Sequence, residues 1–177
     1  DALELEKQKV PTRKLLEDPY HFWYIGKSYY DSTLGDYPLG MDHIKEYARR
    51  SIFYFGQYLN FKHDYHNTGK AKEIDELAYF ALYAMGDMFK LCGSYEKALD
   101  CGMRAEEFAP SRNEHIVLQA ECYKDLSDFD SMKLQTDRLM NPDRKLPFPQ
   151  YNFLLNMEHY NDSGKYCEEL HQIANQV

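Results

Sequence analysis

Two short clusters have the residue types that hold metal ions. In the first, Asp128 and Asp130 flank Phe129, and carboxylates at this spacing could hold a divalent cation against a diphosphate. The surrounding pattern places them in a tight turn between two helices. There Asp128 is expected to cap the second helix, and Phe129 to occupy the place that the core residue Tyr95 has one repeat earlier. We therefore interpret this pair as structural.

The second cluster contains two imidazoles and a carboxylate within four residues, at His63, Asp64 and His66. These are metal-ligating types, but they lack a periodic helical frame and a third ligand at a suitable spacing. A solvated loop is the favoured interpretation. A metal-dependent enzyme that uses His63 and His66 stays as the weaker hypothesis.

Other catalytic signatures are missing from the sequence. It has no Gly-rich phosphate loop, no nucleophile elbow and no HExxH pair. The four cysteines stand 9, 21 and 45 residues apart, which fits no CxxC metal or redox pattern. We expect them to be thiols in a reducing compartment, and hence a cytoplasmic protein. The segment is predicted to be non-catalytic, with no metal or cofactor of its own.

Composition limits both the fold and the partners. The 177 residues carry 21 Lys and Arg against 29 Asp and Glu, a formal charge of −8. This acidic balance argues against a nucleic-acid partner, which would need cations to release phosphate counterions. No apolar stretch is long enough to cross a bilayer, so no membrane partner is expected. With only 3 Val, 6 Ile and 4 Thr there are few β-branched residues for a sheet, and the fold class is predicted to be all-α.

A repeat of 34 residues organises the middle of the chain. Sliding the sequence by this length superimposes large residues on large ones and small on small, which is the signature of stacked helical units. The superimposed pairs are Leu82 with Ile116, Gly86 with Ala120, Phe89 with Tyr123, Tyr95 with Phe129, Ala98 with Met132, and Ala105 with Leu139.

Gly86 is predicted to mark the closest contact between helices. It lies in a stripe with Leu82, Met85 and Phe89 at helical spacing. A glycine inside a helix is destabilising by about 1 kcal/mol relative to alanine, so we expect a second helix to pass too near for a side chain.

The unit boundaries are indicated by Pro110, which ends one unit, and by Ser111 with Glu114, an S-x-x-E capping box for the next helix. The spacing further predicts a first helix over 18–30, with Gly26 at its contact point, and a second over 41–59. A weaker copy of the repeat includes Phe153, Met157, Tyr160 and Ile173.

The first unit resembles a tetratricopeptide repeat, and only Gly102 departs from that pattern. The resemblance implies a right-handed superhelix of antiparallel helix pairs. About four pairs would span 17–177, with 1–16 as an amphipathic lead-in or a linker from an upstream domain. The matching residues are Leu82, Gly86, Phe89, Gly93, Tyr95, Ala98, Ala105 and Pro110.

Three longer phrases, at 15–31, 75–83 and 109–115, resemble in their order the carboxy-terminal helical region of family 2 glycosyltransferases. Tyr20 departs from that family's first phrase, which has arginine there. The resemblance implies a non-catalytic module that docks, oligomerises or presents an acceptor for an upstream sugar-transferring domain. The parent enzyme would then use a sugar nucleotide and a divalent metal.

The tetratricopeptide resemblance also implies an inner face built by the first helix of each pair. That face would be aromatic at one end and mixed in charge at the other, which suits a peptide or a glycan acceptor. Arg112 and Glu114 are interpreted as a structural cap. The face would comprise Tyr20, Trp23, Lys27, Tyr30, Phe80, Tyr83, Asp87, Lys90, Val117, Glu121 and Lys124.

Two hypotheses for function follow. In the first, the chain serves an upstream catalytic domain, and a second copy of the chain is a further partner to test. In the second, it is a free-standing tetratricopeptide-type adaptor that binds a partner protein or peptide.

Overall fold

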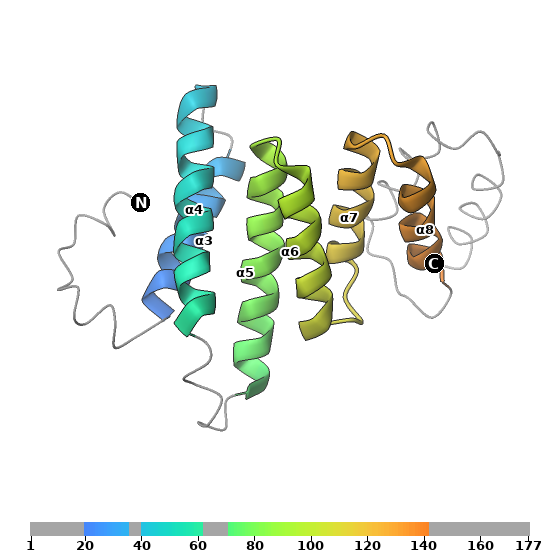
Figure 1. Cartoon of the computed structure of the whole chain (residues 1–177). Coiled ribbons are helices and arrows are strands. Elements are labelled where there is room, and N and C mark those ends of the chain that lie inside the picture. The colour runs from blue at the N-terminus through green and yellow to red at the C-terminus, as the bar shows by residue number, and fades with distance from the viewer. Residues whose placement is uncertain (1–19, 36–39, 62–70, 142–177) are drawn as a thin grey trace.

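The computed structural model describes residues 20–35, 40–61 and 71–141. In these ranges the chain forms helices and no strand, so the all-α prediction is confirmed for this part of the molecule (Figure 1). The lead-in at 1–16, His63 and His66, and the weaker repeat copy from Phe153 onward lie outside the described residues. The helices are α3 (Tyr20–Leu34), α4 (Met41–Phe61), α5 (Ala71–Leu91), α6 (Tyr95–Phe108), α7 (Glu114–Asp125) and α8 (Phe129–Leu139).

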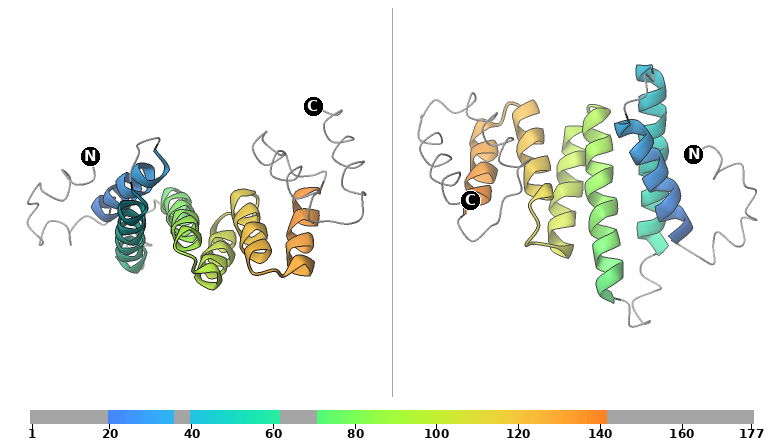
Figure 2. Two further views of the ribbon diagram at one scale, coloured as in Figure 1. Left: turned by 90° about the horizontal axis from the view of Figure 1, so that it is seen from above. Right: turned by 180° about the vertical axis from the view of Figure 1, so that it is seen from behind.

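Each helix packs on the next one along the chain, and the chain zigzags between two layers. In addition to these neighbours, α3 contacts α5 and α5 contacts α7. Seen from above, the first helices α3, α5 and α7 lie along one side and the second helices α4, α6 and α8 along the other (Figure 2). The helices predicted at 18–30 and 41–59 are α3 and α4, with bounds that differ by a few residues.

The 34-residue repeat is visible in the backbone hydrogen bonds of two turns. After α5, the amides of Gly93 and Ser94 donate to the carbonyls of Lys90 and Phe89, each at 2.9 Å. After α7, the amides of Ser127 and Asp128 make the same two bonds to Lys124 and Tyr123, again at 2.9 Å. This is the Schellman arrangement, which requires a left-handed residue at its first amide. The repeat predicted from sequence is therefore confirmed at both turns.

The two turns differ in the residue that adopts the left-handed conformation. Gly93 has φ of +75°, and Ser127 has φ of +60°. A non-glycine residue is destabilising there, because its Cβ approaches the following carbonyl. We expect Ser127→Gly to raise the free energy of unfolding by about 1 kcal/mol and Gly93→Ser to lower it by about as much. Urea denaturation of both variants checks this, and changes of the same sign would contradict it.

Gly86 is the point where three helices meet. A Cβ built on it would lie 2.4 Å from Leu118 Cδ2 on α7, 3.3 Å from the Ala98 carbonyl oxygen on α6 and 3.4 Å from Cys101 Cβ. Leu118 and Ala98 are themselves fully buried. The predicted close approach is therefore confirmed, and α6 and α7 both take part in it.

The other small residues of the pattern also lie at contacts. A Cβ on Gly26 would meet the Phe55 ring of α4 at 3.0 Å. Gly102, the departure from the tetratricopeptide pattern, is buried 3.0 Å from Gln119 Cγ of α7. The small side there leaves space for a large one on the neighbouring helix.

Replacing Gly86 by alanine should destabilise the protein by about 1 to 3 kcal/mol, because the buried Leu118 side chain has little room to move. Gly86→Leu should be worse. The matched control is Gly56→Ala in the interior of α4, where nothing lies within 4 Å of the added methyl. That variant should be more stable by about 1 kcal/mol. Thermal melts that move in the same direction for both alanine variants would contradict this packing.

Candidate functional site

The aromatic end of the predicted inner face forms the core between α3, α4 and α5. The Trp23 ring centroid lies 5.5 Å from that of Phe80, and Tyr30 lies 5.7 Å from the same ring. Trp23 Nε1 also donates to the Leu77 carbonyl at 3.1 Å. Trp23 and Tyr30 are buried, whereas Tyr20 and Phe80 are half-buried. These rings hold α3 on α5, and a role in binding a partner stays a prediction for them.

The charged end of the face forms a connected polar network, which we call the Asp87 network. It comprises Tyr30 on α3, Tyr83, Asp87 and Lys90 on α5, and Glu121 on α7. The Tyr30 hydroxyl donates to Asp87 Oδ2 at 2.9 Å, and Tyr83 also hydrogen-bonds Asp87. Lys90 Nζ lies 4.0 Å from Asp87 Oδ1 and donates to Glu121 Oε2. The structure therefore brings together five of the predicted residues.

Burial controls the protonation of this network. Desolvation raises the pKa of Asp87, although the charge of Lys90 and the bond from Tyr30 oppose it. Desolvation, followed by the charge of Asp87, also raises the pKa values of Tyr30 and Tyr83. The pKa of Lys90 is lowered by burial but raised more by Glu121 and Asp87, with a net rise. At neutral pH both tyrosines remain hydroxyl donors and Lys90 remains charged.

The other predicted inner-face residues lie around this network without joining it. Lys27 pairs with Asp31 at 2.5 Å and lies 5.9 Å from the centre of the Phe80 ring. Val117 is half-buried on α7. Lys124 lies 3.9 Å from Asp125 Oδ1. Lys27 and Lys124 are the more accessible cations of the first-helix layer.

The start of α7 is held in a way that differs from the predicted capping box. The N-cap is Asn113, not Ser111, and α7 begins at Glu114. Glu114 Oε2 instead accepts from the Asn113 amide at 3.1 Å and from the Tyr79 hydroxyl of α5 at 3.1 Å. The prediction of a Ser111 cap was wrong, because the helix starts two residues later than that motif requires.

Arg112 completes this arrangement from the turn before α7. It donates to both carboxylate oxygens of Glu114, at 2.8 and 3.3 Å. Its guanidinium also lies 4.6 Å from the centre of the buried Tyr79 ring. Arg112 and Glu114 thus fix the first turn of α7 to α5, which agrees with their interpretation as a structural cap. Pro110 is exposed, two residues beyond the end of α6.

This arrangement depends on the ionised form of Glu114. Partial burial would raise the pKa of Glu114, but the bonds from Arg112, the backbone amide and Tyr79 outweigh it and lower the pKa to about 2. Because the folded pKa lies below the unfolded value, the carboxylate stabilises the fold above the unfolded pKa. That contribution is lost as pH falls toward 2.

We expect Glu114→Gln to be less stable than the parent at pH 7, by an amount that shrinks as pH falls from about 4.5 to about 2. Chemical denaturation at several pH values measures this difference. The control is Glu107→Gln on the exposed side of α6. A Glu114→Gln difference that does not vary with pH would contradict the ionic role.

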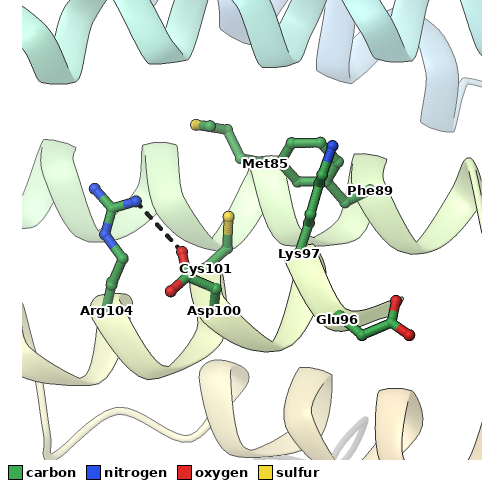
Figure 3. Close-up of a pocket in the computed structure, with 7 residues that line it drawn as sticks. All are labelled: Met85, Phe89, Glu96, Lys97, Asp100, Cys101 and Arg104. Carbon is green, nitrogen blue, oxygen red and sulfur yellow. Dashed lines mark hydrogen bonds and ion pairs between the residues drawn. The ribbon is translucent and has the colours of Figure 1, made fainter. Parts of the chain in front are cut away.

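The sequence gave no signal for a hollow of about 380 Å³ between α5 and α6. Met85 and Phe89 of α5 and Cys101 of α6 line it, and Lys97 and Arg104 stand at its rim (Figure 3). Burial raises the pKa of the Cys101 thiol to about 12, so it stays protonated at neutral pH. This hollow can bind an apolar group, but it offers no thiolate nucleophile.

The two aspartates of the first predicted cluster do not form a metal site in the described ranges. Asp128 Oδ1 accepts from the Ser131 amide at 3.1 Å and caps α8, as expected. Phe129, however, is 47% exposed, so the expectation of a core position was wrong. Within the described residues there is no group of three His, Cys, Asp or Glu side chains that could hold a metal. None of the six described helices has the length and apolar character needed to cross a bilayer.

Comparisons with known proteins give no family for this chain. No protein-family model matches it, and no curated protein matches it. The connection to glycosyltransferases therefore depends on the three sequence phrases.

Proposed function

We propose that this chain is a helical-repeat scaffold that docks another protein domain and carries out no chemistry itself. The observation that carries the proposal is the recurrence, 34 residues apart, of a helix pair with the same turn hydrogen bonds. Stacked helix pairs present extended surfaces that suit the binding of other proteins. The proposed docking surface is the first-helix layer of α3, α5 and α7.

The finer architecture in this proposal is a tetratricopeptide-like, right-handed superhelix of about four antiparallel pairs. The contacts of α3 with α5 and of α5 with α7 support it, because they join the first helices of successive pairs. The glycine contact at Gly86 supports it as well. The expected cytoplasmic location is supported by the free thiols of Cys92, Cys101 and Cys122.

The proposed partner is a sugar-transferring domain encoded upstream in the same natural protein. Its support is the order of the three phrases at 15–31, 75–83 and 109–115. In that case the sugar nucleotide and the divalent metal belong to the partner domain, and this chain docks it, oligomerises it or presents its acceptor. The alternative is a free-standing adaptor for a partner protein or peptide, and it shares the same surface.

The natural reading frame distinguishes these two functions. An upstream α/β domain with an Asp-x-Asp motif is expected. If the upstream sequence lacks such a domain, the glycosyltransferase connection is removed and the adaptor remains.

Where that domain is found, its affinity for this chain can be measured by titration calorimetry with the two parts produced separately. We expect Lys27→Glu and Lys124→Glu each to weaken binding about fivefold, because both reverse accessible cations on the first-helix layer. The control is Lys133→Glu, the same change on an exposed position of α8 in the second layer. Equal effects of all three changes would contradict docking through the first helices.

A further inference from the structure

The Asp87 network connects helices that are not neighbours in the chain. One bond crosses from α3 to α5, where the Tyr30 hydroxyl donates to Asp87 Oδ2 at 2.9 Å. Another crosses from α5 to α7, where Lys90 donates to Glu121. The two crossings meet on α5, because Lys90 Nζ lies 4.0 Å from Asp87 Oδ1. Each crossing therefore shares a group with the other.

The charges in this network do not balance. Two carboxylates, Asp87 and Glu121, share the single ammonium of Lys90, and only 18% of the Asp87 side chain is exposed. A buried carboxylate with incomplete compensation is destabilising, so packing alone gives no reason for it. Local violations of this kind are expected where a residue has a role besides stability.

The groups that face Asp87 come from three helices. They are Tyr30 and Asp31 on α3, Tyr83 and Lys90 on α5, and Glu121 with Cys122 on α7. Tyr30 and Tyr83 supply hydroxyl donors, and Lys90 supplies the only cation of this set. Removing any donor leaves Asp87 more dependent on the ammonium that Glu121 also needs.

We propose that the Asp87 carboxylate couples the α3–α5 and α5–α7 interfaces, so that weakening one interface changes the strength of the other. When Tyr30 donates to Asp87, Lys90 is free to favour Glu121. Without that hydroxyl, Lys90 is drawn toward Asp87 and its bond to Glu121 weakens. When Asp87 is neutral, this competition ends and the two interfaces act independently.

A double-mutant cycle tests the coupling, because Tyr30 and Glu121 share partners only through α5. The unfolding equilibrium constant is measured for Tyr30→Phe, Glu121→Gln and the double variant. We expect the double variant to differ by more than about threefold from the product of the single effects. The control cycle pairs Tyr30→Phe with Glu114→Gln, which also joins α7 to α5 but through Tyr79. Its effects should multiply to within about twofold.

The same cycle in an Asp87→Asn background identifies the coupling residue. The pKa of folded Asp87 is raised, so ionised Asp87 is destabilising at neutral pH and stability is gained as it is protonated. Asp87→Asn is therefore expected to fold at least as stably as the parent. The deviation between Tyr30 and Glu121 should fall below about twofold in this background.

Hydrogen exchange gives a second measurement that does not need global unfolding. Tyr30→Phe should speed exchange of α7 amides by more than about twofold, and it should not do so when Asp87→Asn is also present. Multiplicative effects for Tyr30 and Glu121, with unchanged α7 exchange, would overturn the proposal. So would a deviation that persists unchanged in the Asp87→Asn background.

Discussion

The close approach of α5 to α6 and α7 at Gly86 is the constraint on which the rest of the described structure depends. The buried side chain of Leu118 fills the space that a Cβ on Gly86 would take. Only at this separation do the side chains of α5 reach α7, where Tyr79 bonds Glu114 and Lys90 bonds Glu121. A packed interior does not deform continuously, so a larger residue here would separate both polar contacts. The apolar contact thus positions the polar residues of the first-helix layer.

The repeat and its packing could be predicted because both depend on local signals. Helical spacing put Leu82, Met85, Gly86 and Phe89 on one face, and the same order 34 residues later indicated a second copy. Turn geometry also repeats, since Gly93 and Ser127 occupy equivalent left-handed positions. The helices at Tyr20–Leu34 and Met41–Phe61 followed from the same periodicity. Such features depend on backbone conformation and on which residues are small.

The candidate site was predicted less completely, because side-chain exposure depends on how distant elements meet. Trp23 and Tyr30 were assigned to an inner face, and the packing of α3 against α5 buries both. Phe129 matches Tyr95 in the repeat yet is exposed, since equivalent positions need not have equivalent neighbours. At Glu114 the motif was noticed, but its partners are Arg112 and Tyr79 rather than a Ser111 cap. The hollow beside Met85 and Phe89 depends on a gap between helices, which no spacing rule indicates.

The contact between Gly86 and Leu118 can be measured directly in solution by nuclear Overhauser effects on protein with labelled leucine methyl groups. An α-proton of Gly86 occupies the direction in which a Cβ would lie 2.4 Å from Leu118 Cδ2. The structure therefore predicts a strong cross-peak between the Gly86 α-protons and a Leu118 methyl group. Absence of that cross-peak, with both resonances assigned and the protein folded, would contradict the stacking of helix pairs described above.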